Sequence, residues 1–191
     1  GTPRGPGQRW TGITHPDGTR ETYEYSPFGQ LIRVEDEMGR ETRYELDALG
    51  RTVGTKTPDG ADIRVQYDSA TGEVASLTNP LGHTRRWFHD AQGRLTEGVD
   101  EAGHATHYFY DDARLPDRPT RIRDAHGATK RLQWDAAGQL LAYTDCSGQT
   151  TEYSYDPRGN LVAVTNAEGQ TMRHQVDAMG RLLAVQHPDG A

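Results

Sequence analysis

The chain is poor in cysteine, lysine and long apolar runs. Its 191 residues include one cysteine, Cys146, which excludes a disulfide framework within this sequence. Two lysines occur, and no run of basic residues forms the positive patch by which proteins bind nucleic acids. No apolar run approaches the roughly 18 residues of a membrane-spanning helix. We therefore expect neither a nucleic acid nor a membrane as a partner.

Large apolar side chains are also scarce. Leu, Ile, Val and Phe together number 29, and the mean hydropathy is −0.87, both typical of a disordered chain. The net charge is only −7, however, with 21 basic and 28 acidic residues interspersed. Trp and Tyr add 12 large side chains. Composition alone therefore does not show whether the chain folds. The order of the residues is the remaining evidence.

Glycine is abundant, and its spacing is regular. Sixteen of the 22 glycines recur at steps of 10 to 12 residues, with one gap of 24. They are Gly18, Gly29, Gly39, Gly50, Gly60, Gly72, Gly82, Gly93, Gly103, Gly127, Gly138, Gly148, Gly159, Gly169, Gly180 and Gly190. Pairs of steps give a repeat of about 21 residues, which indicates an array of small, similar units. Such arrays usually act as surfaces or containers.

Two kinds of turn alternate along the array. In the YD turns, Asp follows an aromatic or aliphatic residue and precedes Gly by three positions; the alternate turns lie between them. Asp in the first position bonds the backbone ahead of it, and Gly in the fourth supplies a positive φ, so both kinds predict type I turns. The structural turn residues singled out are Asp47, Gly50, Asp100, Gly103, Asp135, Gly138, Asp156, Gly159, Asp177 and Gly180.

Between the turns lie segments of six to seven residues whose polarity alternates. Alternate residues of a strand point to opposite faces, so each segment predicts a strand with one apolar and one polar face. The apolar columns are rich in aromatic rings: Tyr23, Tyr25, Tyr108, Tyr110, Trp134, Tyr153 and Tyr155. Leu31, Leu95, Leu140, Leu161 and Leu182, close to the turns, are expected on the opposite, more mixed face.

Short turns join neighbouring strands antiparallel, so the sequence predicts an all-β, long antiparallel β-meander of about sixteen strands. We interpret residues 1–10 as a leader or linker and residues 11–191 as one continuous array, a fragment of a longer assembly. Residues 110–119 replace one missing glycine turn and predict a longer, proline-stiffened turn. A sheet this long normally curls or closes, and its apolar face must be buried.

The repeated unit resembles the YD repeat of Rhs proteins, most clearly at residues 100–111 and 151–161. The resemblance implies a curved sheet that forms part of a β-cocoon, or shell. It implies a structural segment of an Rhs-type polymorphic toxin that encapsulates a C-terminal toxin domain of a secreted antibacterial effector. Teneurins carry a more distant version of these repeats in animal adhesion.

The resemblance also implies partners and a location. The partners would be the C-terminal toxin domain of the same parent chain, further YD repeats and the secretion machinery. The protein would be bacterial, held in the cytoplasm before export and then secreted by type VI secretion. An alternative function is a cell-surface adhesion module, or one that binds a carbohydrate or protein ligand.

We expect no catalytic residue, metal or cofactor, and hence no enzyme activity. The YD-turn aspartates could be calcium ligands, but equivalent turns lie about 10 Å apart, too far to share an ion. His83 and His104 are similarly separated, and Cys146 occupies a turn position held by Ala or Glu in sister repeats. Residues 156–159 approach the Asp-Pro-x-Gly-Leu signature of Rhs self-cleavage but depart at Asn160, so we interpret them as an ordinary turn.

The aromatic columns have two compatible interpretations. The rings can pack across strands on an ordinary sheet face, or they can line a cavity that holds a partly unfolded polypeptide. The sequence does not fix which face would look inward. A sugar-binding surface is a third interpretation, although the columns are too regular to mark one site.

Overall fold

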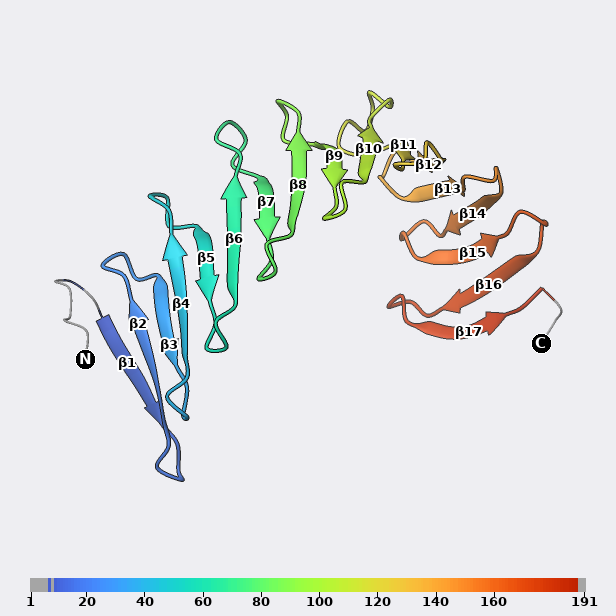
Figure 1. Ribbon diagram of the computed structural model, residues 1–191. Helices are drawn as coiled ribbons and strands as arrows, with labels where there is room; N and C mark the ends of the chain where they lie inside the picture. Colours follow the sequence, from blue (N-terminus) through green and yellow to red (C-terminus); the bar gives the residue numbers. More distant parts are fainter. Residues whose placement is uncertain (1–6, 8, 189–191) are drawn as a thin grey trace. The chain divides into compact units, whose positions relative to one another are not determined.

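The computed structural model describes residue 7 and residues 9–188, and this part of the chain forms strands and turns without a helix (Figure 1). The fold class expected from the sequence, an all-β antiparallel meander, is confirmed, with seventeen strands instead of about sixteen. No helix long and apolar enough to span a membrane occurs among the described residues. Most of the expected leader, and Gly190, lie outside them.

The chain divides into two compact units, Gly1–Gly93 and Arg94–Ala191. In the first unit each strand pairs antiparallel with the next one along the chain. Its strands are β1 (Arg9–Thr14), β2 (Arg20–Tyr25), β3 (Leu31–Glu35), β4 (Glu41–Leu46), β5 (Thr52–Lys56), β6 (Asp62–Tyr67), β7 (Val74–Thr78) and β8 (Thr84–His89).

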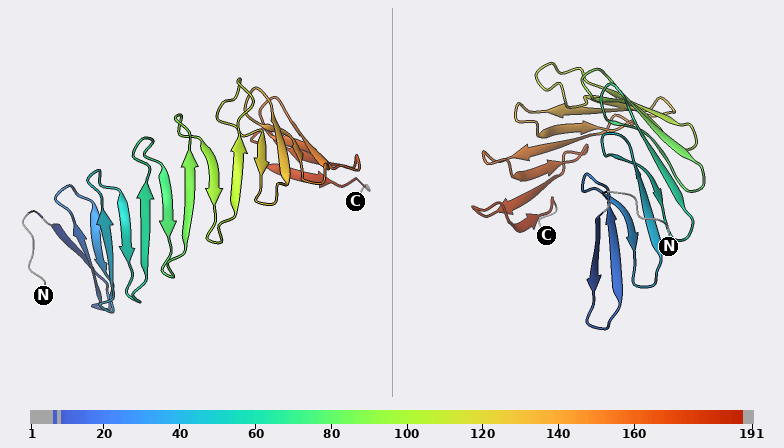
Figure 2. Two further views of the ribbon diagram at one scale, coloured as in Figure 1. Left: turned by 45° about the horizontal axis from the view of Figure 1, so that its top comes forward. Right: turned by 90° about the vertical axis from the view of Figure 1, so that its left-hand side faces the viewer.

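The second unit follows the same rule of sequential antiparallel pairing. Its strands are β9 (Leu95–Val99), β10 (Ala105–Phe109), β11 (Arg121–Arg123), β12 (Thr129–Trp134), β13 (Leu140–Thr144), β14 (Thr150–Tyr155), β15 (Leu161–Thr165), β16 (Thr171–Val176) and β17 (Leu182–Gln186). Within each unit the strands lie side by side as successive hairpins (Figure 2).

The observed register separates apolar from polar residues as the alternation predicts. In the β14–β15 pair, Tyr153 lies opposite Val164, and the next position along pairs Ser154 with Ala163. Ala142 and Ala163, each 8% exposed, are the most buried apolar residues described, and both lie on the polar face among longer side chains. The aromatic face is only half-buried, because each unit is a single layer of sheet.

A β-bulge interrupts the register near the YD-turn end of most hairpins. Bulges of this kind lie between Glu24 and Tyr25 and between Ser154 and Tyr155. Each bulge places a residue that follows the turn directly opposite the last aromatic or aliphatic residue of the preceding strand, and in four of the six described bulges this residue is leucine. Leu31, Leu140, Leu161 and Leu182 lie opposite Tyr25, Trp134, Tyr155 and Val176. The expectation that these leucines belong to the opposite face is therefore wrong for these four, because bulges break strict alternation.

The turns have the geometry of a type I turn followed by a G1 bulge. In the turn that begins at Asp135, the Gly138 amide donates to the Asp135 carbonyl at 3.0 Å, and the Asp135 amide donates to the Gln139 carbonyl at 2.9 Å. Fifteen of the sixteen regularly spaced glycines, all those described, have φ between 75° and 87°. Residues 110–119 form two successive turns, at Asp112–Leu115 and Leu115–Arg118, as the longer-turn interpretation requires.

Candidate functional site

The aspartates of the turns cap the backbone with their side chains. Asp47 Oδ1 accepts from the amides of Leu49 and Arg51, each at 2.9 Å, and Oδ2 accepts from Arg51 Nε at 2.7 Å. The same pair of amide bonds recurs at the other turn aspartates singled out from the sequence, Asp100, Asp135, Asp156 and Asp177. The carboxylates are thus engaged in the turns themselves, which favours capping over the calcium alternative.

These hydrogen bonds hold the carboxylates in their ionised form. Donation by the backbone amide four residues on is the leading cause that lowers the pKa of Asp47, Asp100 and Asp177 below its ordinary value. At Asp156 the Asn160 side-chain amide contributes most, followed by the Asn160 backbone, and the pKa is again lowered. The paired glycines Gly50, Gly103, Gly138, Gly159 and Gly180 all have positive φ.

A second set of hydrogen bonds links successive YD turns, and it was not predicted from the sequence. The residue after the turn glycine reaches a backbone carbonyl of the next YD turn: Arg51 donates to Gly72 at 3.3 Å and Gln139 to Gly159 at 3.0 Å. Arg94 makes the equivalent bond to Pro116, whereas in the turn of Gly159 it is Arg158, the residue before the glycine, that donates to Ala178. The only sequence signal is a long polar side chain at this position.

Three of the predicted aromatic rings, each at or directly after the end of a strand, are fixed by hydrogen bonds to the backbone. The hydroxyls of Tyr110 and Tyr155 donate to the carbonyls of Leu95 and Leu140, at 2.8 and 2.9 Å, and Trp134 Nε1 donates to Pro119 at 2.9 Å. Each acceptor lies fifteen residues before its donor. Arg94 stacks on Tyr110 and Arg118 on Trp134, with distances of 4.7 and 5.3 Å to the ring centroids.

The remaining predicted rings pack on the same face, and none of them makes this backbone bond to another described residue. Tyr108 lies opposite Ile122, Tyr153 opposite Val164, and Tyr23 opposite Val34. Tyr25 lies opposite Leu31 at a bulge. The Tyr23 hydroxyl donates to Glu21, which raises the pKa of Tyr23. All seven rings are half-buried, so they can pack across strands and also remain accessible to another chain.

The other residues weighed from the sequence sit in turns. His104 lies 3.1 Å from Asp100 and its ring centroid is 6.2 Å from that of His126, while Cys146 is exposed. Residues 156–159 form an ordinary capped turn.

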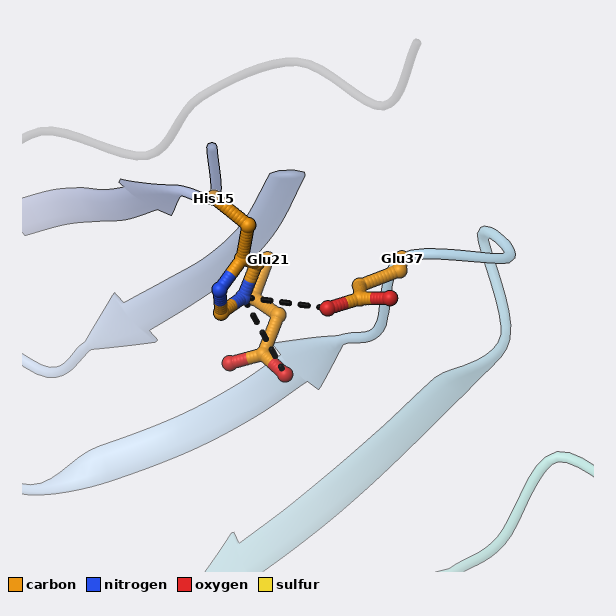
Figure 3. Close-up of side chains that lie close together, drawn as sticks. All are labelled: His15, Glu21 and Glu37. Carbon is orange, nitrogen blue, oxygen red and sulfur yellow. Dashed lines mark ion pairs between the residues drawn. The ribbon is translucent and has the colours of Figure 1, made fainter. Parts of the chain in front are cut away.

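One cluster of potential metal ligands was not foreseen. His15 Nε2 lies 3.0 Å from Glu37 Oε1 and 3.9 Å from Glu21 Oε1 (Figure 3). The ligand atoms of the three side chains all lie within 4.8 Å of one another. Its signal in the sequence is Glu21, which departs from the residue types that sister repeats hold at that position, whereas the position of His15 is also held by His187.

The repeat geometry agrees with a comparison against protein families. The sequence model of the RHS repeat matches residues 25–62, 67–99, 89–129 and 134–171, well over half of the chain. The chain belongs to the RHS repeat family. This confirms the resemblance stated from the sequence.

Among curated proteins, these RHS repeats are similar to "Toxin protein Tse5" of Pseudomonas aeruginosa. The two sequences are 41% identical over 140 residues, which cover 73% of this chain and 11% of the relative. The chain thus spans about a tenth of the length of the toxin that it matches.

Solved structures show the same fold at low sequence identity. A crystal structure of TcdB2–TccC3–Cdc42 matches with a TM-score of 0.59 and 15% identity, over 88% of this chain and 11% of that chain. The Tc holotoxin pore of Photorhabdus luminescens matches with a TM-score of 0.52 and 15% identity, over 88% of this chain and 14% of that chain. The RHS repeats therefore share their β fold with parts of larger toxin proteins.

Proposed function

We propose that this RHS repeat array is a structural segment of a shell that encloses the C-terminal toxin domain of its parent protein. The observation that carries the proposal is the aromatic face, which stays half-exposed along a single-layered sheet. The 41% identity to a toxin protein supports a toxin as the parent. The segment would act as a wall held together by cross-strand hydrogen bonds, with no enzyme activity and no cofactor of its own.

The chemistry of the two faces favours one orientation of the wall. The polar face carries charged side chains such as Arg64, Arg131 and Glu152, which interact well with water. The opposite face carries tyrosines whose rings are apolar and whose tips form hydrogen bonds, a combination suited to holding a loosely folded polypeptide. Burial of apolar surface is favourable, so the aromatic face is expected to look inward, toward the guest.

Enclosure of the toxin would also protect the cell that makes the parent protein. A toxin enclosed by a wall cannot act on the cell that makes it. We therefore propose that the parent is made in the cytoplasm, exported by type VI secretion against competing bacteria, and opened only afterward. The further repeats of the parent would complete the shell, and the secretion machinery would be its other partner.

Site-specific photocrosslinking in the full-length parent tests both the enclosure and its orientation. p-Benzoylphenylalanine is placed at Tyr108 or Tyr153 on the aromatic face and, as matched controls, at the neighbouring His107 or Ser154. The proposal predicts crosslinks to the C-terminal domain from the two tyrosine positions only. Mass spectrometry of the digested products identifies the partner peptides.

Two other crosslinking results would contradict parts of the proposal. Crosslinks from His107 and Ser154 alone would show that the polar face looks inward and would contradict the orientation. Crosslinks from all four positions to other molecules, with none to the C-terminal domain, would contradict enclosure and favour an adhesion surface.

A further inference from the structure

Because equivalent positions of the repeats can be compared, a residue that differs from its counterparts in the sister repeats can be identified. Six of the nine alternate turns begin with Asp or Asn, as at Asp36, Asn79 and Asp145; the others begin with His15, Thr57 and His187. The third residue after the turn glycine is Thr, Ile, Arg, Lys or Met in the sister strands, but it is Glu21 after Gly18. Glu21 lies in the same hairpin as His15, and neither side chain is needed to form the turn or the strand.

The fold brings His15 and Glu21 together with a second carboxylate, Glu37. His15 opens the turn between β1 and β2, Glu21 lies on β2, and Glu37 lies in the turn between β3 and β4. The turns of His15 and Glu37 are adjacent on one side of the sheet, so their side chains converge (Figure 3). The capping carboxylate in the second turn is Asp36, which leaves Glu37 without a role in the turn.

The imidazole of His15 has a ring nitrogen that is shielded and lacks a hydrogen-bond partner. His15 Nε2 is shielded from solvent, yet it makes no hydrogen bond of proper geometry, although Glu37 Oε1 lies 3.0 Å away. A shielded ring nitrogen without a partner is costly. A metal ion bound to its lone pair would satisfy it, and the carboxylates would balance the charge of the ion.

The distances fit a small tetrahedral ion. Zinc bonds of about 2.1 Å to nitrogen and oxygen place neighbouring ligands about 3.4 Å apart. The observed separations of 3.0 and 3.9 Å from Nε2 to the two carboxylates lie on either side of this value. The remaining oxygen of Glu21 accepts a hydrogen bond from the Tyr23 hydroxyl, the kind of outer contact that orients a metal-ligating carboxylate.

We propose that His15, Glu21 and Glu37 bind one divalent transition-metal ion of the zinc class. The ion joins the β1–β2 hairpin to the β3–β4 hairpin and so fastens the first two repeats of the described array. Its fourth position is left for water. Because the ion binds the folded chain and not the unfolded one, it stabilises these hairpins by mass action.

The repeats also supply the variants for the test. His15→Asn, Glu21→Thr and Glu37→Ala each introduce a residue that sister repeats hold at the same position, so the hairpins should still fold. The matched controls are Glu101→Ala, which removes a glutamate from the position of Glu37 in another turn, and His104→Gln, which removes an exposed histidine. Circular dichroism without metal checks that every variant keeps its β spectrum.

Zinc chloride is titrated into the tag-free 191-residue chain at neutral pH by calorimetry, and melting temperatures are recorded with and without the metal. The expected result is one zinc per chain and a higher melting temperature, with binding weakened at least about tenfold in each of the three variants. Cobalt substitution should give the intense visible bands of a tetrahedral site in the wild type and in both controls.

Two results would overturn the proposal. One is zinc that neither binds nor shifts the melting temperature of the wild-type chain, which would leave the cluster as an ion pair. The other is zinc binding that survives in a chain carrying all three substitutions, which would place the metal elsewhere.

Discussion

At the scale of the residue, order in this chain depends on a few positions that recur in nearly every repeat. A turn aspartate accepts two backbone amides, and a glycine three residues later adopts a φ that other residues rarely do. The residue after the glycine reaches the next YD turn, and a terminal ring bonds a carbonyl one hairpin away. Each contact is small, so stability is distributed along the array.

The first prediction concerns Gly138, whose φ is +79°. Gly138→Val should lower the free energy of unfolding by more than about 1 kcal/mol, because a β-branched residue tolerates a positive φ poorly. Ala137→Val, one residue earlier in the same turn, is the control and should have a smaller effect, because no described residue other than glycine has a positive φ. Urea denaturation measures both, and equal effects would contradict the turn geometry.

The second prediction concerns the hydroxyl of Tyr155, which donates to the Leu140 carbonyl at 2.9 Å. Tyr155→Phe keeps the ring and removes the bond, so it should cost about 0.5–1.5 kcal/mol of unfolding free energy. Tyr153→Phe, on the same strand and face, should cost less, because no hydrogen bond to the Tyr153 hydroxyl occurs within the described array. Thermal melts followed by circular dichroism test the difference, and a reversed order would refute the role of the bond.

Some contacts of single residues could be predicted from the sequence, and others could not. The positive φ of Gly50 and Gly138 and the capping by Asp47 and Asp135 follow from local turn chemistry. The stacking of Arg51 on Tyr67 does not, because it depends on how two residues 16 positions apart meet across a hairpin. The convergence of His15 and Glu37 is non-local in the same way.

At the scale of the element, the hairpin is the unit of the architecture. Alternation of polar and apolar residues predicts the two faces, and the register confirms it for pairs such as Tyr153 and Val164. The bulges beside the YD turns escaped prediction, because alternation read from a single strand carries no signal of one extra residue in its partner. They bring leucines such as Leu161 against the terminal rings, which adds to the aromatic face.

The turn aspartates predict how stability depends on pH. Hydrogen bonds lower the pKa of Asp36, Asp47, Asp100 and Asp177 in the folded chain, with backbone amides as the leading cause. A group whose pKa is lowered by folding stabilises the protein above its unfolded pKa, about 3.9 for Asp, and this stability is lost as the pH falls through the folded pKa. The melting temperature should therefore fall steeply below about pH 4.

Differential scanning calorimetry from pH 7 to pH 2.5 measures this dependence. The net charge of −7 gives the competing expectation, since relief of repulsion between acidic groups would stabilise the fold on acidification. A melting temperature that rises between pH 4 and pH 3 would contradict the capping account.

At the scale of the whole molecule, the chain consists of RHS repeats in two units, each a single layer of antiparallel strands. The repeat period and the turn chemistry were sufficient to predict the fold class from the sequence. The division at Gly93 was not predicted, because the glycine spacing continues through it without a break. The function of such a layer depends on what covers the aromatic face, and we propose that this partner is the C-terminal domain of the parent chain.

The structure of the full-length parent protein, determined by electron cryomicroscopy before toxin release, tests the central claim most directly. Our account predicts that these repeats form part of a closed wall whose aromatic face lines a cavity filled with density for the C-terminal domain. An open array with solvent on both faces, or an empty cavity with the C-terminal domain outside it, would contradict the account.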